Sequence, residues 1–88
     1  MTDTLHPARP IHPGVILRRE METREWTENM LSIKSDIPVW RIKKLLEGSV
    51  VTELVAVRLA RAFSTSAEFW LNLQRIYDEA VAAKEKNT

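Results

Sequence analysis

The segment from Arg58 to Gln74 constrains the fold of this chain more than any other part of it. Leading into the segment, apolar residues recur at the i, i+3, i+4 and i+7 spacing of one helix face, at Ala56, Leu59, Ala60 and Phe63. Thr65 and Glu68 then stand three residues apart, as in a capping box, where the Thr side chain accepts a hydrogen bond from a backbone N–H of the next helix. The segment therefore predicts two amphipathic helices joined by a capped turn.

The second of these helices is expected to start near Ser66 and to present one broad apolar stripe, formed by Phe69, Trp70, Leu73, Ile76, Tyr77 and Ala80. We interpret Phe69, Trp70, Leu73, Ile76 and Tyr77 first of all as core residues, and Phe69 and Leu73 before the others. Because so wide a stripe can bury one edge in its own domain and share the other, we expect Trp70, Leu71 and Tyr77 to contact a second copy of the chain.

Two further helix starts are marked by local signals. Pro13 suits the first turn of a helix, where its missing N–H has no helical partner, and the helix that follows is expected to bury Ile16, Leu17 and Met21. Thr52 is the expected N-cap of the helix that carries Leu59 and Phe63.

Between these helices the chain has the pattern of a helix-turn-helix, at about residues 27–47. Thr27 is expected to cap a helix that runs to about Lys34 with Met30, Leu31 and Ile33 inward. After a turn at residues 35–37, Pro38 starts a helix that ends at Gly48 and buries Ile42, Leu45 and Leu46. The exposed positions of that second helix are then 40, 41 and 44.

Size and composition predict one small all-α domain. The 88 residues suffice for one modest core and are too few for two, so we assign residues 1–11 to a mobile arm, 12–83 to the domain and 84–88 to a tail.

The chain has no Cys, and its two histidines, His6 and His12, do not make a metal site. No catalytic triad or phosphate-binding loop is present, so we expect neither an enzyme nor a cofactor. No run is apolar enough to span a membrane, and a cytoplasmic location fits this composition best.

Two motifs stand near the two ends of the predicted domain. The opening motif is Ile11-His12-Pro13-Gly14-Val15-Ile16-Leu17-Arg18, and the closing motif runs from Leu59 through Phe63 and from Phe69 through Gln74. Together they resemble the HigA family of antitoxins, within the Cro and lambda-repressor-like proteins. The resemblance covers roughly residues 11–81. It implies a five-helix repressor that dimerises, binds double-stranded operator DNA of its own operon and neutralises a HigB-like, mRNA-cleaving toxin.

The resemblance implies that DNA contacts lie on the helix-turn-helix. The residues expected there are Thr27, Glu28, Asn29, Val39, Trp40, Arg41, Lys43, Lys44 and Ser49. The net charge of the chain is only +1, so any attraction to DNA must be local, and Arg41, Lys43 and Lys44 fall within four residues. Arg can pair with guanine edges, while Lys can neutralise phosphates.

The same surface departs from the family pattern. Glu28 replaces a Gln, Ser35-Asp36 replaces a Leu-Gly pair, and Ser49-Val50-Val51 replaces a basic loop. Trp40 has three readings: contact with a thymine methyl or a sugar, contact with a partner protein, or packing back onto the domain. With Val39, Val50, Val51, Leu54 and Val55 it is a candidate for an exposed apolar surface, and such surfaces mark protein contacts.

Two alternative functions follow from these departures. One is a protein-interaction module on a repressor scaffold that has lost DNA binding. The other is a stand-alone regulator without a toxin, which the absence of a short basic reading frame beside the gene would indicate. If a toxin is bound, we expect the contacts to come from residues 1–11 and from the first helix. These segments can become ordered on binding.

Overall fold

The structure is a computed structural model that describes residues 10–86, of which the last is described by its backbone alone. Within this range the chain forms five helices: α1 (Pro13–Arg24), α2 (Glu28–Ser35), α3 (Val39–Glu47), α4 (Glu53–Phe63) and α5 (Ala67–Lys86). The predicted all-α, five-helix fold is confirmed.

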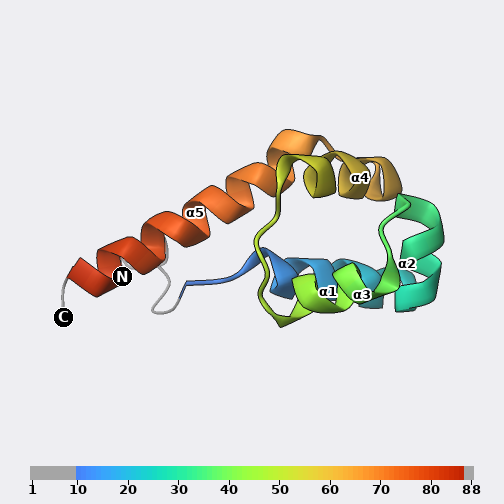
Figure 1. The fold of residues 1–88 in the computed structure, drawn as a ribbon, viewed down its shortest axis with the longest axis horizontal. Helices are drawn as coiled ribbons and strands as arrows, with labels where there is room; N and C mark the ends of the chain where they lie inside the picture. Colours follow the sequence, from blue (N-terminus) through green and yellow to red (C-terminus); the bar gives the residue numbers. More distant parts are fainter. Residues whose placement is uncertain (1–9, 87–88) are drawn as a thin grey trace.

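The helices pack in two levels around one core (Figure 1). α1 and α3 lie side by side at the base of the view, and α4 lies above them with the start of α5 against it. α2 closes one end, and the second half of α5 projects beyond the bundle at the other. Every helix contributes to the core, which includes Leu17, Leu31, Ile42, Leu59 and Trp70.

Several helix ends follow the local signals in the sequence. The Thr27 and Thr52 hydroxyls cap α2 and α4 by accepting hydrogen bonds from the backbone N–H groups of Met30 and Val55, at 3.1 and 3.3 Å. Gly48 ends α3 at φ 119°, a conformation that favours glycine.

The start of α5 differs from the predicted capping box. Ser66, rather than Thr65, caps the helix, because its Oγ accepts from the Phe69 N–H at 3.1 Å. The Thr65 hydroxyl instead accepts from the indole N–H of Trp70 at 2.9 Å. This pairing satisfies the only polar atom of a side chain that is otherwise buried in the core.

Four predicted core positions were wrong. On α5, Ile76 is 54% exposed and Phe69 is 41% exposed, while Trp70 is 1% exposed and packs against Phe63 with ring centroids 5.6 Å apart. On α2, Met30 and Ile33 face outward and Leu31 alone of the three is buried, because the inward face of this helix is formed by Leu31 and Ser35, which lie one turn apart. The helix α5 also continues to Lys86, so residues 84–86 are helical rather than part of a tail.

Residues 1–9 of the expected arm, including His6, lie outside the described residues. Among the helices of residues 10–86, none combines the length and the apolar character that a membrane crossing requires.

Candidate nucleic-acid interface

The turn between α2 and α3 is fixed by short polar side chains. Ser35 is fully buried, and its hydroxyl donates to the Leu31 carbonyl at 2.7 Å and accepts from the Ile37 N–H at 3.2 Å. Asp36 adopts the left-handed conformation with φ 62°, which glycine provides in many turns. From α4, the Arg58 guanidinium donates to the Asp36 carbonyl at 2.8 Å. The turn is therefore held from both the helix-turn-helix and α4.

The three positions of α3 predicted to face outward do so, and Lys43 is exposed in addition. Ile42 and Leu45 are buried at 0 and 1% exposure, and Trp40, Arg41 and Lys44 are exposed. The Arg41 guanidinium lies over the Trp40 ring, 4.8 Å from its centroid, so a cation and a large flat apolar surface are presented together.

Most of the other predicted DNA-contact residues meet in one place. A cleft of about 570 Å³ is lined by Thr27, Glu28, Asn29, Val39 and Lys43, from the starts of α2 and α3 and the middle of α3. Arg18 and Glu22 of α1 also line it, and the sequence analysis did not assign them to the site. Ser49 is exposed in the loop after α3 and is not part of the cleft.

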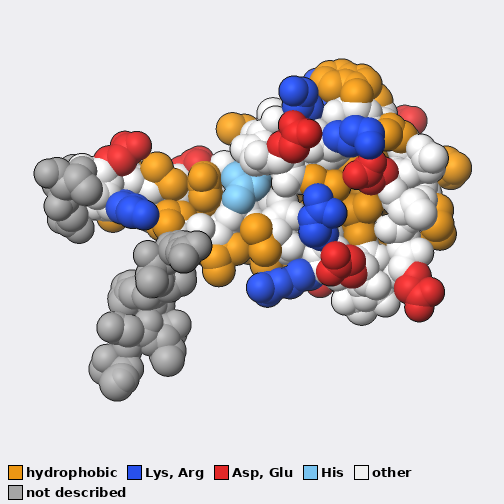
Figure 2. Space-filling model, turned by 90° about the horizontal axis from the view of Figure 1, so that it is seen from below, with side chains coloured by type: hydrophobic (Ala, Val, Ile, Leu, Met, Phe, Trp, Pro, Cys, Tyr) orange, Lys and Arg blue, Asp and Glu red, His pale blue; other side chains and the backbone are white. Residues whose placement is uncertain are grey.

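An ion pair crosses this cleft. The Lys43 ammonium lies 2.7 Å from a carboxylate oxygen of Glu28, which joins the start of α2 to the middle of α3. Seen from the α1 and α3 side, acidic side chains alternate with basic ones over the surface (Figure 2). The face is therefore mixed in charge rather than uniformly basic.

The expected apolar surface around Trp40 is present in part. Trp40, Val50 and Leu54 are each 59% exposed, but Val51 and Val55 are buried at 4 and 5%. Together with Ile37, Trp40 and Leu54 line a groove of about 400 Å³ between α3 and α4. The Val51 side chain is unavailable to a partner because it is buried, and the Val51 N–H donates to the buried Gln74 side chain of α5 at 2.9 Å.

The opening motif has a structural explanation. The His12 ring caps α1 by accepting from the Gly14 N–H at 2.8 Å through Nδ1. Gly14 is needed because an added Cβ would lie 2.4 Å from the Leu45 carbonyl oxygen, where α1 crosses α3. The motif thus sets how closely α1 approaches the helix expected to read DNA.

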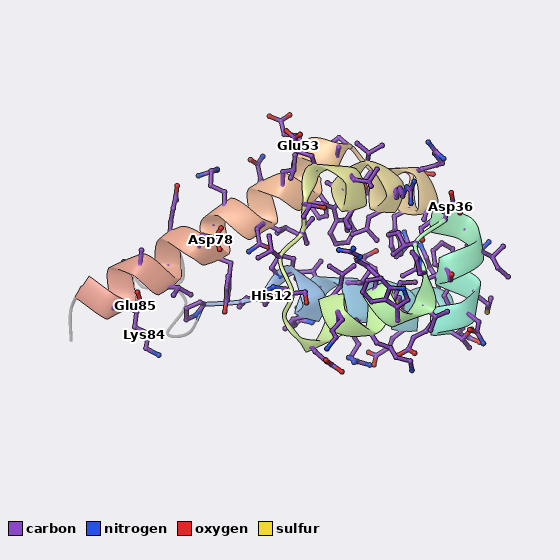
Figure 3. The ribbon with its side chains drawn as sticks, in the orientation of Figure 1. His12, Asp36, Glu53, Asp78, Lys84 and Glu85 are labelled. Atoms are coloured by element: carbon purple, nitrogen blue, oxygen red, sulfur yellow. The ribbon has the colours of Figure 1, made fainter. Side chains whose placement is uncertain are left out.

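His12 also connects α1 to α5. Its ring meets the Tyr77 ring edge-on with centroids 4.9 Å apart. Burial lowers the pKa of His12 below its ordinary value of 6.5, and the Ser49 backbone, the Asp78 carboxylate and the Gly48 backbone oppose that shift in decreasing order. His12 and Asp78 are labelled in Figure 3. The neutral ring is the form that can cap α1 through Nδ1.

The predicted contact with a second copy needs one correction. Trp70 is 1% exposed and packs between Phe63 and Phe69, so its side chain is not available to another subunit. Leu71 and Tyr77 are half-buried and keep part of their surface exposed. No group of three or more His, Cys, Asp or Glu side chains in residues 10–86 is arranged to hold a metal ion.

Comparison with known proteins identifies the relatives of this chain. No protein-family model matches it. The antitoxin HigA-1 of Vibrio cholerae is 34% identical over 71 residues, which span 80% of this chain and 68% of the relative.

Two solved structures extend the similarity to the fold. An addiction module antidote protein of the HigA family from Coxiella burnetii is 41% identical, with a TM-score of 0.83 over 90% of this chain and 88% of that one. The Pseudomonas aeruginosa antitoxin HigA, solved with its higBA promoter, is 34% identical, with a TM-score of 0.82 and the same coverage.

Proposed function

Because the chain belongs to the HigA family of antitoxins, we propose that it represses its own operon by binding the operator as a dimer and neutralises a HigB-like toxin in the cytoplasm. Antitoxins of this family are DNA-binding regulators and not enzymes, in agreement with the sequence prediction. The observation that carries the DNA part of the proposal is the similarity, in both sequence and fold, to an antitoxin solved with its promoter.

On this proposal α3 enters the major groove. Arg41 and Lys44 are exposed on the same side of α3, where Arg41 lies within its first turn and is suited to base edges. Lys44, three residues on, is suited to a phosphate. The Trp40 ring beside Arg41 supplies the apolar surface that a thymine methyl or a sugar would contact.

Binding as a dimer would allow a chain with a net charge of only +1 to bind DNA. Two copies of α3, set about one DNA turn apart, double the base and phosphate contacts of one chain. Leu71 and Tyr77 of α5 are our candidates for the contact between copies, because both retain exposed surface on a helix that extends beyond the bundle (Figure 1). The proposal of a toxin partner rests on the membership of this chain in the antitoxin family.

The first test is fluorescence anisotropy of the protein on its own promoter fragment and on a scrambled fragment of equal length, across a salt series. We expect the promoter to be bound tightly and with strong salt dependence, because each neutralised phosphate adds about 0.9 to the log–log slope. Equal, weak binding to both fragments would contradict the repressor function.

A second test removes the proposed contacts. Replacing Arg41 and Lys44 together by Ala should weaken operator binding by roughly a hundredfold or more. The lost Arg41 base contact costs about 1–3 kcal/mol in each subunit of a dimer, and the lost Lys44 phosphate contact adds to this cost. The matched control is Arg61→Ala with Arg75→Ala, which removes two exposed cations from α4 and α5. Far-UV circular dichroism of both variants should match the parent.

One alternative has an observation of its own. The groove that Trp40 and Leu54 line between α3 and α4 is apolar and open, as expected for a protein-interaction module on a repressor scaffold. Absence of any preference of the parent for its promoter, together with loss of toxin capture in Trp40→Ala, would favour this function. The assay takes as its toxin the product of a short basic reading frame beside the gene.

A further inference from the structure

The ion pair between Glu28 and Lys43 lies in the middle of the surface expected to meet DNA. Glu28 is the first residue of α2, and Lys43 stands on α3, fifteen positions along the chain. Their charged atoms are 2.7 Å apart, and the side chains keep 32 and 58% of their surface exposed, respectively. The pair is therefore both formed in the free protein and accessible to a duplex.

The pair changes the charge that α3 presents. Of the three cations in α3, Lys43 is the one with a carboxylate partner among residues 10–86, and Arg41 instead lies over the Trp40 ring. An ion pair has no net charge, so it releases no counterion when a phosphate approaches. If Lys43 leaves for a phosphate, Glu28 remains as an unpaired carboxylate close to the polyanion. In either case one cation of α3 contributes little to binding.

Glu28 has a reason to remain at this position. A carboxylate in the first turn of a helix interacts favourably with the helix dipole, and α4 begins with the same arrangement, Thr52 followed by Glu53. A glutamine would keep the size of the side chain and lose its charge. The charge of Glu28 can therefore be removed without removing a packing contact.

We propose that Glu28 sets the affinity of this protein for DNA of any sequence, by withholding Lys43 from the phosphates. The inference rests on the proposed operator binding. A weak sequence-independent affinity matters for a repressor because a genome offers a vast excess of competing sites, which would otherwise sequester it. Operator binding then depends mainly on the base contacts of Arg41 and its neighbours.

The test compares Glu28→Gln with the parent on the promoter and scrambled fragments over a salt series. In Glu28→Gln the freed Lys43 neutralises one phosphate per subunit, so both log–log slopes should steepen by about 0.9 per subunit. At about 0.1 M salt this corresponds to a gain in affinity on the order of five- to tenfold per subunit.

The matched control is Glu53→Gln. Glu53 is also the first residue of a helix behind a capping Thr, but it lies on the side of the bundle away from α1 and α3 (Figure 3). Its removal makes the same change in net charge and should leave both slopes unchanged. The double variant Glu28→Gln/Lys43→Met loses one charge of each sign and should return the slope to that of the parent.

Two results would overturn the inference while leaving operator binding in place. Unchanged slopes in Glu28→Gln, with a shallower slope in both Lys43→Met and the double variant, would mean that Lys43 already contacts a phosphate. Loss of promoter binding alone in Glu28→Gln would mean that the carboxylate reads a base edge. By contrast, steeper slopes in Glu28→Gln without any preference for the promoter would support the role of Glu28 and contradict the proposed operator function.

Discussion

At the scale of single residues, polar side chains stand where glycine is common. Glu25, Asp36 and Ser64 all end helices in the left-handed conformation, with φ between 57 and 62°, and only α3 ends at a glycine. The loss of the Leu-Gly pair in the turn is compensated by Ser35, whose hydroxyl makes two hydrogen bonds in the core. Both hydrogen bonds are made by the Ser35 Oγ atom, so a single substitution that removes this atom should reveal their contribution to stability.

Replacing Ser35 by Ala should lower the free energy of unfolding by about 1–3 kcal/mol, because the buried Ile37 N–H loses its acceptor. Urea unfolding followed by circular dichroism measures this change. Ser32→Ala, on the same helix but only half-buried, is the control and should have a much smaller effect. Equal effects of the two substitutions would mean that the Ser35 hydrogen bonds contribute nothing specific.

His12 should make stability depend on pH. Its pKa is lowered in the folded state, so above the ordinary value of 6.5 both states are neutral and the contribution is complete. As the pH falls below 6.5 the unfolded chain takes up the proton first, and stability is lost until the folded-state pKa is passed. Urea unfolding between about pH 7.5 and 5.5 should show this loss in the parent. In His12→Asn, which keeps a side chain able to cap α1, the loss should be smaller.

At the scale of helices and loops, two contacts place α3 relative to the rest of the domain. Gly14 lets α1 approach the backbone of α3, and Gln74 of α5 accepts from the Val51 N–H in the loop that follows α3. The Gln74 amide also donates to Asp78 at 2.9 Å, so its orientation is fixed. Gly14 belongs to the opening motif and Gln74 to the closing motif, and both residues position the helix-turn-helix.

Gly14→Ala should therefore destabilise the protein by about 1–3 kcal/mol, because the new methyl group collides with the Leu45 carbonyl and forces α1 and α3 apart. Thermal unfolding provides the measurement. Arg19→Ala, at an exposed position of the same helix, is the control for a change to Ala on α1. An unchanged melting temperature in Gly14→Ala would show that the two helices can separate at no cost.

At the scale of the whole molecule, the operator binding proposed for this HigA-type antitoxin requires two copies to be arranged on one duplex. The surface of α1 and α3 faces one side of the bundle, while α4 and Glu53 face the other (Figure 3). A dimer can bind one duplex only if both copies turn the first surface toward it. The contact between copies must then lie beside this surface, which the projecting part of α5 satisfies (Figure 1).

Such a dimer should be sensitive to the spacing of its two half-sites. Inserting roughly five base pairs, about half a helical turn, between them places the half-sites on opposite faces of the duplex and should abolish cooperative binding. An insertion of about one full turn restores the facing but adds roughly 34 Å to the separation, so a dimer with a fixed distance between its two α3 helices should not regain its affinity. Anisotropy titrations of the three duplexes test this, and equal affinity for all three would mean that the copies bind independently.

The local features of this protein follow from its residue pattern alone. Helix ends depend on residues within one turn, so Pro13, Thr27, Thr52 and Gly48 were enough to predict where α1 to α4 begin or end. The strong amphipathic pattern of α3 likewise predicted that Ile42 and Leu45 are buried and that positions 40, 41 and 44 are outward. These inferences need only the chemistry of neighbouring residues.

Contacts between residues that are distant in the chain follow instead from how the helices pack. The broad stripe of α5 allowed Phe69 or Trp70 to be the core residue, and packing against Phe63 selected Trp70 and removed it from the predicted contact with a second copy. Glu28 and Lys43 likewise carry no sequence signal of their pairing, because the turn between α2 and α3 sets how their side chains meet. Periodicity defines a helix face, but the neighbouring helix determines which edge of that face is buried and which charges are neutralised.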